Sequence, residues 1–167
     1  MSEEVKRNYL EINSLQDLKE GNTPSEDYSL SLIDPINFQL NKFFYKNIGK
    51  NHKWVDRLTW SEEKWINYVS NESVRSYVFK FNDDLVGFFE LIFHPKKNET
   101  EIAYFGILEE YQNKKLGSYL LSEAIKKSFE NKVNRVWVHT CSLDHKNALN
   151  NYISRGMKIF KTEILNI

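Results

Sequence analysis

The sequence predicts a mixed α/β fold with a mostly antiparallel sheet. Between residues 74 and 108, three segments with alternating apolar side chains are separated by short turns, which is the pattern of an antiparallel meander. Two earlier segments, around residues 36–48 and 61–69, repeat their apolar side chains at helical spacing instead. After the meander, helix and strand patterns alternate to the last residues, and this order is typical of mixed α/β sheets.

The chain has 167 residues, a length typical of one domain, and we expect residues 1–167 to form a single domain. Lys and Arg total 23 and Asp and Glu total 23, so the formal net charge is zero and gives no electrostatic basis for binding nucleic acid or an acidic membrane. The one cysteine, Cys141, cannot form an internal disulfide, and no run approaches the roughly 18 apolar residues of a membrane span. We therefore expect a cytoplasmic protein without nucleic-acid or membrane partners.

The first part of the chain, residues 1–73, mixes strand and helix patterns. We expect strands at residues 5–12 and 28–33, joined by a polar stretch rich in turn-forming residues. A helix is expected at residues 36–48. Ser61 is a suitable N-cap for a second helix, because two glutamates follow it in the first turn.

The second part, residues 74–167, carries the meander and the alternating elements after it. The patterns predict strands and helices in the following order: strands at 74–81, 85–93 and 101–108, a helix at 116–129, a strand at 135–141, a helix at 145–154 and a strand at 157–165. Asp144 is expected to cap the last helix at its N-terminus and Gly156 to end it.

The segment with the clearest chemistry is residues 107–125, where a strand leads through a short loop into a helix. The first backbone N–H groups of a helix lack internal partners and lie at the positive end of its dipole, so such a loop can bind a pyrophosphate. Gly117 allows backbone and ligand to approach closely, and Lys114 and Lys115 can add positive charge. The alternative is an ordinary helix start without a ligand.

Two motifs at this separation favour the ligand-binding interpretation. Residues 112–117 read Gln-Asn-Lys-Lys-Leu-Gly, and a later short helix carries Tyr152 shortly before Gly156. Together they resemble the Gcn5-related N-acetyltransferase (GNAT) family, whose phosphate loop reads Gln/Arg-x-x-Gly-x-Gly/Ala and whose later helix carries a tyrosine followed by Gly-Phe. Lys115 stands where a glycine is usual, and His145 stands where many members have an asparagine near the pantetheine arm.

The resemblance covers residues 74–165 in its order of elements and implies a GNAT-like fold. In that fold the sheet is splayed between its fourth and fifth core strands and flanked by helices. The implied reaction is acetyl transfer from acetyl-CoA to an amine without a covalent enzyme intermediate. Such a reaction needs a base for the ammonium, a donor for the oxyanion and an acid for the departing thiolate.

The catalytic assignments follow from the resemblance and from residue chemistry. Glu101, at the start of the strand before the phosphate loop, is the first candidate for the base, and His139 is the second because its ordinary pKa suits proton transfer. Tyr152 matches the tyrosine that the family places near the CoA sulfur, and it is the candidate acid. The oxyanion donor is expected to be a backbone N–H near Gly106, where a glycine suits a β-bulge.

The resemblance also assigns the residues that hold acetyl-CoA, which is the only cofactor or co-substrate that we expect. The expected cofactor-binding residues are Ile107, Leu108, Gln112, Asn113, Lys114, Lys115, Leu116, Gly117, Ser118, His145 and Asn147. The four histidines and Cys141 show no zinc-type spacing, so no metal is expected. Cys141 itself is more typical of a small packed residue than of a nucleophile.

Substrate selection is expected to come from residues 1–73. Residues 51–60 hold two tryptophans, a histidine, an aspartate and an arginine, and this density is typical of a pocket wall. The expected substrate-binding residues are Trp54, Asp56, Arg57, Trp60 and, on a neighbouring strand, Glu90. Asp56 or Glu90 can meet an ammonium and Arg57 a carboxylate. The alternative is that the tryptophans cover the core and that Asp56 and Arg57 form a surface pair.

The favoured function is therefore an N-acetyltransferase that acts on a primary amine of a small molecule. A protein or peptide lysine acetyltransferase and a non-catalytic acyl-CoA-binding module are the alternatives. The neutral charge and the aromatic wall favour a small-molecule acceptor over a protein. A homodimer is compatible with such a sheet.

Overall fold

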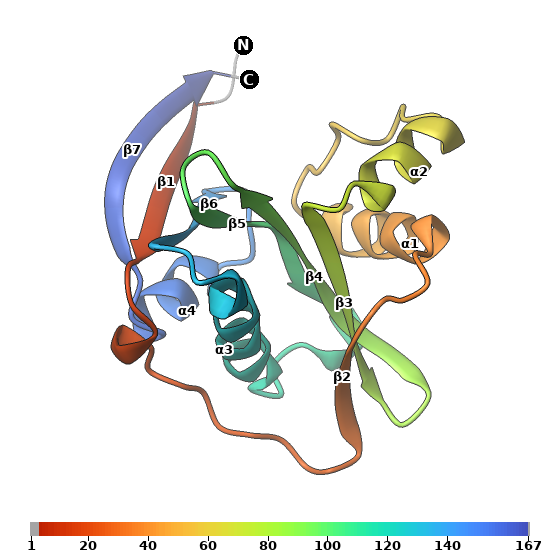
Figure 1. Cartoon of the computed structure of the whole chain (residues 1–167), viewed down its shortest axis with the longest axis horizontal. Coiled ribbons are helices and arrows are strands. Elements are labelled where there is room, and N and C mark those ends of the chain that lie inside the picture. Colours follow the sequence, from red (N-terminus) through yellow and green to blue (C-terminus); the bar gives the residue numbers. More distant parts are fainter. Residues whose placement is uncertain (1–3, 167) are drawn as a thin grey trace.

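The structure is a computed structural model of the chain, and it describes residues 4–166 (Figure 1). The strands are β1 (Glu4–Ile12), β2 (Tyr28–Leu32), β3 (Val74–Phe81), β4 (Asp84–His94), β5 (Glu99–Ile107), β6 (Arg135–Cys141) and β7 (Lys158–Asn166). The α-helices are α1 (Phe38–Gly49), α2 (Glu62–Ser70), α3 (Leu116–Ser128) and α4 (Ala148–Ser154). Short 3-10 turns lie at Leu15–Asp17, Glu109–Tyr111 and Phe129–Asn131.

The described strands form one seven-stranded sheet in the order β2-β3-β4-β5-β6-β1-β7. All neighbouring pairs are antiparallel except β5 and β6, which are parallel. That parallel ladder joins only Glu99–Glu101 to Arg135–Trp137, after which the two strands separate. These are the fourth and fifth strands across the sheet, so the expected splay and the mixed, mostly antiparallel sheet are confirmed.

Helices cover both faces of the sheet (Figure 1). The helix α3 packs its apolar side on one face, where Leu120 and Leu121 are fully buried among side chains from β1 and β3–β6. The helix α1 covers the other face of the meander, where Phe44 stacks on Phe88 with ring centroids 4.9 Å apart. Because neighbouring residues of a strand point to opposite faces, Phe88 and Phe89 enter different clusters.

The local predictions hold best where periodicity is strong. The strands β3 and β6 have the bounds that their alternation predicts, and Ser61 caps α2 by accepting a hydrogen bond from the Lys64 N–H at 3.1 Å. The expected start of α4 is wrong, because its N-cap is Asn147 and the Asp144 carboxylate instead accepts the Cys141 N–H at 2.9 Å. Gly156 does follow that helix, in a left-handed conformation with φ of 105°.

The expected β-bulge at Gly106 is also wrong. The register of β4 and β5 shifts between Glu90, which is opposite Tyr104, and Leu91, which is opposite Ile102, so the extra residue is Ala103. Gly106 has a different role, because a Cβ atom there would lie 2.6 Å from Cγ2 of Ile48. The glycine therefore allows α1 to approach the sheet closely beside the splayed strands.

Candidate active site

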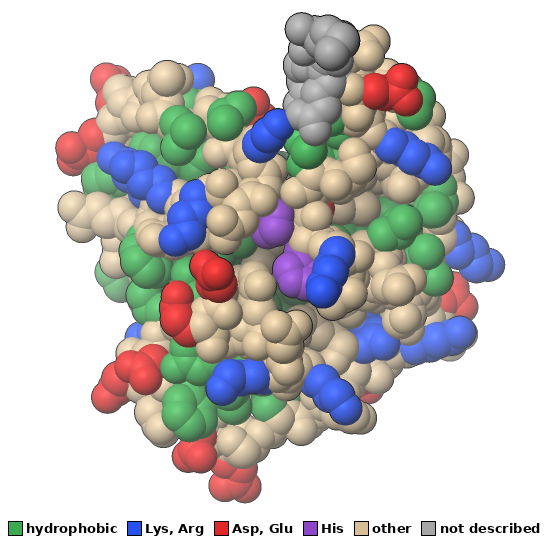
Figure 2. All heavy atoms as spheres, turned by 180° about the vertical axis from the view of Figure 1, so that it is seen from behind, with side chains coloured by type: hydrophobic (Ala, Val, Ile, Leu, Met, Phe, Trp, Pro, Cys, Tyr) green, Lys and Arg blue, Asp and Glu red, His purple; other side chains and the backbone are tan. Residues whose placement is uncertain are grey.

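A cleft of about 1250 Å³ opens where β5 and β6 separate. Its walls come from β5 and β6, the loop before α3, the loop and helix after β6, and the loop after α1. Seen from behind, the molecule is hollowed near the middle, with histidine side chains gathered there (Figure 2). The cleft therefore runs from the start of α3 to the segment between α1 and α2, which joins the two regions expected to bind cofactor and acceptor.

The loop at one end of the cleft leads into α3, and the residue before the helix has a left-handed backbone conformation. Lys115 is the N-cap of α3 with φ of 62°, and Asn113 has φ of 64°. Lys115 therefore adopts the conformation for which the family's usual glycine is suited, at a cost of about 1–2 kcal/mol. The first N–H groups of the 13-residue helix follow it, and Gly117 and Ser118 line the cleft there.

Side chains hold this loop in place. Gln112 donates from Nε2 to the Ile107 carbonyl at 3.2 Å, which ties the loop to the end of β5. Asn151 of α4 donates from Nδ2 to the Gly117 carbonyl at 3.1 Å. Two of the expected cofactor residues, Leu108 and Lys114, do not line the cleft: Leu108 is buried in the core, and the Lys114 ammonium lies 5.8 Å from the Tyr111 ring.

The open edge of β5 provides backbone donors to the cleft. The Leu108 N–H donates to the Val86 carbonyl of β4 at 2.8 Å. Because the polar groups of a strand alternate between its two edges, the N–H groups of Phe105 and Ile107 point toward the side from which β6 has moved away. Both residues line the cleft, so these N–H groups can receive an oxyanion.

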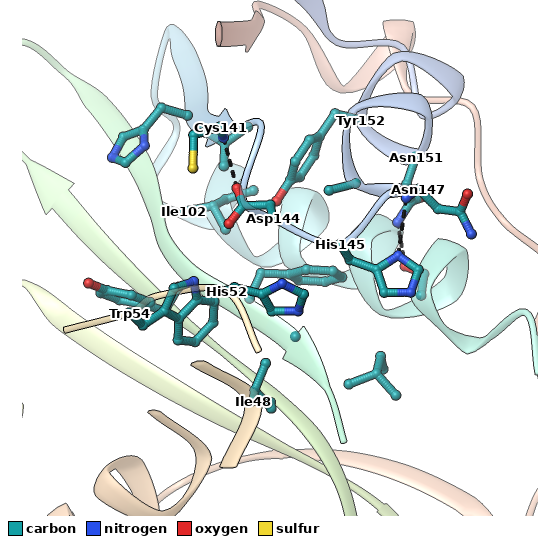
Figure 3. Close-up of a pocket in the computed structure, with 18 of the residues that line it drawn as sticks. Ile48, His52, Trp54, Ile102, Cys141, Asp144, His145, Asn147, Asn151 and Tyr152 are labelled. Atoms are coloured by element: carbon teal, nitrogen blue, oxygen red, sulfur yellow. Dashed lines mark hydrogen bonds between the residues drawn. The ribbon is translucent and has the colours of Figure 1, made fainter. Parts of the chain in front are cut away.

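Tyr152 lies in the wall of the cleft opposite that edge. Its ring is 7% exposed and points from α4 toward Asp144 (Figure 3). Burial, with a smaller contribution from the Asp144 carboxylate, raises the pKa of the Tyr152 phenol above its ordinary value. The phenol is therefore protonated at neutral pH, as an acid must be before it acts.

Asp144, which the sequence predicts only as a helix cap, lines the cleft. Its carboxylate accepts hydrogen bonds from the Cys141 N–H and the Thr140 hydroxyl. Burial is the main cause that raises the pKa of the Cys141 thiol, and the Asp144 carboxylate raises it further. The thiol therefore stays protonated and unreactive. Its partners lie only three and four residues before it, at the end of β6, so the carboxylate closes the turn after this strand and does not cap α4.

Glu101 and His139 face the cleft from β5 and β6. The Glu101 carboxylate lies 3.0 Å from Nε2 of His94. The His139 imidazole is open to water in the cleft, yet the surrounding protein lowers its pKa, chiefly by desolvation and then through Arg7. The structure thus brings both candidate bases to the same cleft as Tyr152.

The wall expected to bind the acceptor is the loop after α1. His52, Trp54, Asp56 and Arg57 all line the cleft from this loop. Trp54 packs against Tyr104 of β5 with ring centroids 4.8 Å apart, so the wall is aromatic, as its composition predicts.

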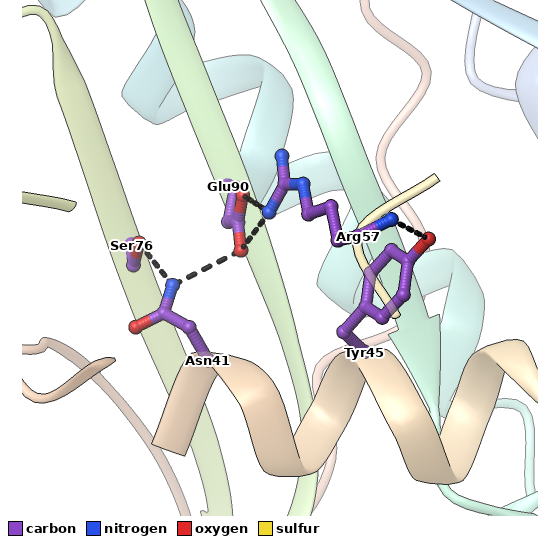
Figure 4. A network of polar contacts seen from close by, with 5 residues as sticks. All are labelled: Asn41, Tyr45, Arg57, Ser76 and Glu90. Atoms are coloured by element: carbon purple, nitrogen blue, oxygen red, sulfur yellow. Dashed lines mark hydrogen bonds and ion pairs between the residues drawn. The ribbon is translucent and has the colours of Figure 1, made fainter. Parts of the chain in front are cut away.

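Two of the expected acceptor residues lie outside this lining. Glu90 is fully buried and forms an ion pair with Arg57, with 2.9 Å between Oε1 and Nη1, and accepts a second hydrogen bond from Asn41 at 3.0 Å (Figure 4). Its position leaves no access for a substrate ammonium. Trp60 packs on the Arg57 guanidinium, 4.8 Å from its ring centroid, instead of lining the cleft.

Arg57 is consequently neither a surface residue nor a free cation. Its guanidinium lies 4.2 Å from the Tyr68 ring centroid and 4.3 Å from that of Tyr104, and its backbone N–H donates to the Tyr45 hydroxyl. The alternative of an Asp56–Arg57 surface pair is wrong, because Arg57 is only 6% exposed and its partner is Glu90. The Arg57–Glu90 ion pair and the aromatic rings around Arg57 thus hold the loop after α1, called the acceptor loop below, against the sheet.

Within residues 4–166, no group of three His, Cys, Asp or Glu side chains is arranged to hold a metal ion. None of the helices in this part of the chain is long and apolar enough to cross a membrane.

Similarity to known proteins identifies the family of the chain. The family model of the acetyltransferase (GNAT) family matches residues 38–157, from the start of α1 to the residue before β7. The chain belongs to the GNAT family. This family comprises acetyltransferases that use acetyl-CoA as co-substrate, and the match to α1 and α2 extends beyond the two motifs that first suggested it.

Solved structures of GNAT proteins share the fold. A GNAT protein from Sphaerobacter thermophilus is 15% identical with a TM-score of 0.74, over 99% of this chain and 52% of that one. A tandem GNAT protein from the clavulanic acid biosynthesis pathway is 12% identical with a TM-score of 0.64, over 95% of this chain and 51% of that one. An aminoglycoside acetyltransferase from an uncultured soil metagenomic sample is 14% identical with a TM-score of 0.58, over 78% of this chain and 88% of that one.

The chain spans about half the length of the first two structures, and at such identities the likeness is one of fold. No curated protein matches the sequence.

Proposed function

We propose that this GNAT protein transfers an acetyl group from acetyl-CoA to a primary amine of a small molecule by direct attack. The observation that carries the proposal is the continuity of the cleft. It joins the loop at the start of α3, the open edge of β5, Tyr152 and the aromatic loop after α1. These are the parts that acetyl transfer needs, brought together in one cleft.

The residues present fit acetyl-CoA. The helix N-terminus at Leu116–Ser118 offers backbone donors for a pyrophosphate, and Lys115 adds a positive charge at the same place. A Cβ atom built on Gly117 would meet a single neighbour, Nδ2 of Asn151 at 3.5 Å, so the backbone there is open to a ligand. His145 and Asn147 continue this wall toward Tyr152.

The chemistry then follows from the side chains of the cleft. Acetyl-CoA supplies the thioester, and the acceptor amine attacks its carbonyl carbon after losing one proton. The N–H groups of Phe105 and Ile107 receive the oxyanion of the tetrahedral intermediate. Tyr152 donates its phenolic proton to the sulfur as the carbon–sulfur bond breaks, and the second proton of the amine nitrogen returns to the phenolate. The products are the acetamide, CoA and one proton, so the reaction balances.

A small acceptor is favoured over a protein lysine by two features. The acceptor wall is aromatic, with Trp54 and Tyr104 in contact, and the formal net charge of the chain is zero. Glu101 contributes a negative charge that attracts an ammonium to the cleft.

The test is release of free thiol from acetyl-CoA across a panel of amino acids, amino sugars, polyamines and a lysine peptide, with mass spectrometry of the products. We expect thiol release with one small-amine class and a product heavier by one acetyl group. Acetylation of the peptide alone would contradict the choice of acceptor. Thiol release that is independent of every amine would contradict acetyl transfer.

A further inference from the structure

His52 joins the two walls of the cleft. It lies in the loop after α1, and its Nδ1 atom is 3.1 Å from the carbonyl oxygen of Leu143 in the loop after β6. Its ring packs beside Trp54 and meets His145 edge-on, with centroids 6.3 Å apart. Figure 3 places His52 between Trp54 and His145 in the pocket.

This contact fixes the tautomer of His52. A carbonyl oxygen can only accept a hydrogen bond, so Nδ1 must carry the hydrogen. In the neutral ring Nε2 then holds a lone pair, and no hydrogen bond within residues 4–166 occupies that nitrogen. A histidine held in this way is a base with a fixed orientation, because the bond at one nitrogen determines the state of the other.

His145 has the opposite tautomer. Its Nδ1 accepts the backbone N–H of Asn147 at 3.1 Å, so Nε2 carries the hydrogen when the ring is neutral. Desolvation, His52 and Lys146 lower the pKa of His145, which keeps this ring neutral. The two facing rings therefore offer the cleft one acceptor, on His52, and one donor, on His145.

We propose that Nε2 of His52 is the proton acceptor for the substrate ammonium. This inference rests on the proposed function and adds a residue to it. The ammonium gives one proton to Nε2, the freed lone pair forms the carbon–nitrogen bond, and the imidazolium releases the proton to water after turnover. His52 lines the cleft from the same loop as Trp54 and Asp56, so an amine bound against this wall would lie near the imidazole.

The two bases expected from the sequence are held differently. The Glu101 carboxylate already lies against His94, at 3.0 Å. The His139 ring packs against Tyr9 with centroids 5.5 Å apart, and no hydrogen bond within residues 4–166 fixes its tautomer. Only the His52 imidazole, of these three groups, has one nitrogen fixed as a donor to the protein and the other left as an acceptor.

The electrostatic surroundings of His52 are mixed in sign. On its own loop lie Lys53 and Asp56, and on the opposite loop lie Asp144, His145 and Lys146. Glu101 and His139 face the same cleft from β5 and β6. These groups are the ones that a pH profile has to separate from His52, so the test compares variants at matched pH.

The test uses replacements that imitate one ring nitrogen at a time. His52→Asn retains a donor near the position of Nδ1 and can keep the bond to Leu143, but it lacks a base at Nε2. His52→Ala lacks both. For His52→Asn we expect unchanged affinity for acetyl-CoA by calorimetry and a fall in kcat of about a hundredfold or more near neutral pH. The remaining rate should rise tenfold per pH unit, as the amine deprotonates in solution, whereas the wild-type rate should depend less steeply on pH.

Controls separate this role from a structural one. Asn51→Ala, at an exposed neighbour on the same loop that does not line the cleft, should leave kcat unchanged. Added imidazole should restore part of the rate of His52→Ala. A pH signature that appears in Glu101→Gln or His139→Asn and not in His52→Asn would overturn the proposal.

A second readout does not depend on turnover. Two-bond hydrogen–nitrogen correlation spectra of the ¹⁵N-histidine-labelled chain report which ring nitrogen of His52 carries the hydrogen. We expect hydrogen on Nδ1, and hydrogen on Nε2 would overturn the proposal even if no substrate is known. Failure of the wild-type chain to bind acetyl-CoA would contradict the proposed function instead, so the two failures are distinguishable.

Discussion

Glu90 and Arg57 form an ion pair inside the protein, with 2.9 Å between Oε1 and Nη1 and exposed fractions of 0% and 6%. Arg57 belongs to the acceptor loop and Glu90 to β4, next to the bulge in the adjoining strand. The pair therefore couples the position of the acceptor loop to the splayed part of the sheet. Its energetic role follows from burial, since a buried charge without its partner is strongly unfavourable.

Glu90→Gln should lower the free energy of unfolding by about 3–5 kcal/mol, because Arg57 is left buried without a counter-charge. The measurement is urea-induced unfolding followed by circular dichroism. The control is Glu130→Gln, which breaks the surface ion pair with Lys127, where the glutamate is 48% exposed, and should cost less than about 1 kcal/mol. Similar losses for both variants would show that the buried pair is not special.

Gly117→Asp should abolish acetyl-CoA binding, because it puts a negative side chain where the pyrophosphate is proposed to lie. Gly117→Ala is the matched control. Its Cβ would make only an ordinary contact with Nδ2 of Asn151, so the fold and most of the affinity should survive. Calorimetric titration of both variants checks this, and tight binding by Gly117→Asp would rule out the loop as the phosphate site.

Tyr152→Phe should reduce kcat by about a hundredfold or more while acetyl-CoA still binds, since the ring is kept and only the acidic proton is lost. Because burial raises the pKa of this phenol, the wild-type rate should not fall between pH 8 and 10 through loss of the acid. Steady-state kinetics over this range tests both points. Equal turnover in the variant would remove Tyr152 from the mechanism.

Lys115→Gly should raise the free energy of unfolding by about 1 kcal/mol, because φ of 62° is strained for lysine and not for glycine. The same variant removes an ammonium from the proposed phosphate site and should weaken acetyl-CoA binding. Lys114→Gly, at a neighbour without positive φ, should give no stabilisation. Thermal unfolding and calorimetry of both variants separate backbone strain from charge.

Alkaline solution should destabilise the protein. Burial is the largest cause of raised pKa values at Tyr68, Tyr104 and Tyr152, while an unfolded tyrosine titrates near a pKa of about 10. Above that pH the unfolded chain loses protons that the folded chain retains, so the free energy of unfolding falls as pH rises; below it the contribution is fully present. Urea unfolding at pH 8 and 11 should show a smaller fall for Tyr104→Phe than for the wild type, and an equal fall would contradict the assignment.

Many elements of this fold can be predicted from local sequence patterns. The alternation of β3 and β6 gives their bounds, the serine before two glutamates gives the start of α2, and the motif at residues 112–117 gives the loop before α3. Each of these signals is carried by residues close together in the chain. Hydrophobic periodicity, helix capping and turn chemistry depend on residues close together in the chain, so they can be recognised without the tertiary structure.

The features that local patterns do not predict are long-range pairs. Glu90 reads as a candidate for binding an ammonium until Arg57 is seen beside it. His52 has no assigned role until the Leu143 carbonyl fixes its tautomer. Gly106 suggests a bulge, but a glycine is needed there because Ile48 of α1 leaves no space for a Cβ atom. In each case the partner comes from a distant element, and the chemistry of the residue changes when that partner is present.

Binding of acetyl-CoA in the cleft is tested most directly by calorimetric titration of acetyl-CoA into the wild-type chain, repeated with Gly117→Asp. We expect one-to-one binding by the wild type and none by the variant, because the cleft between β5 and β6 is proposed to hold the co-substrate on the first turn of α3. Absence of binding by the folded wild-type chain, or equal binding by both, would contradict it.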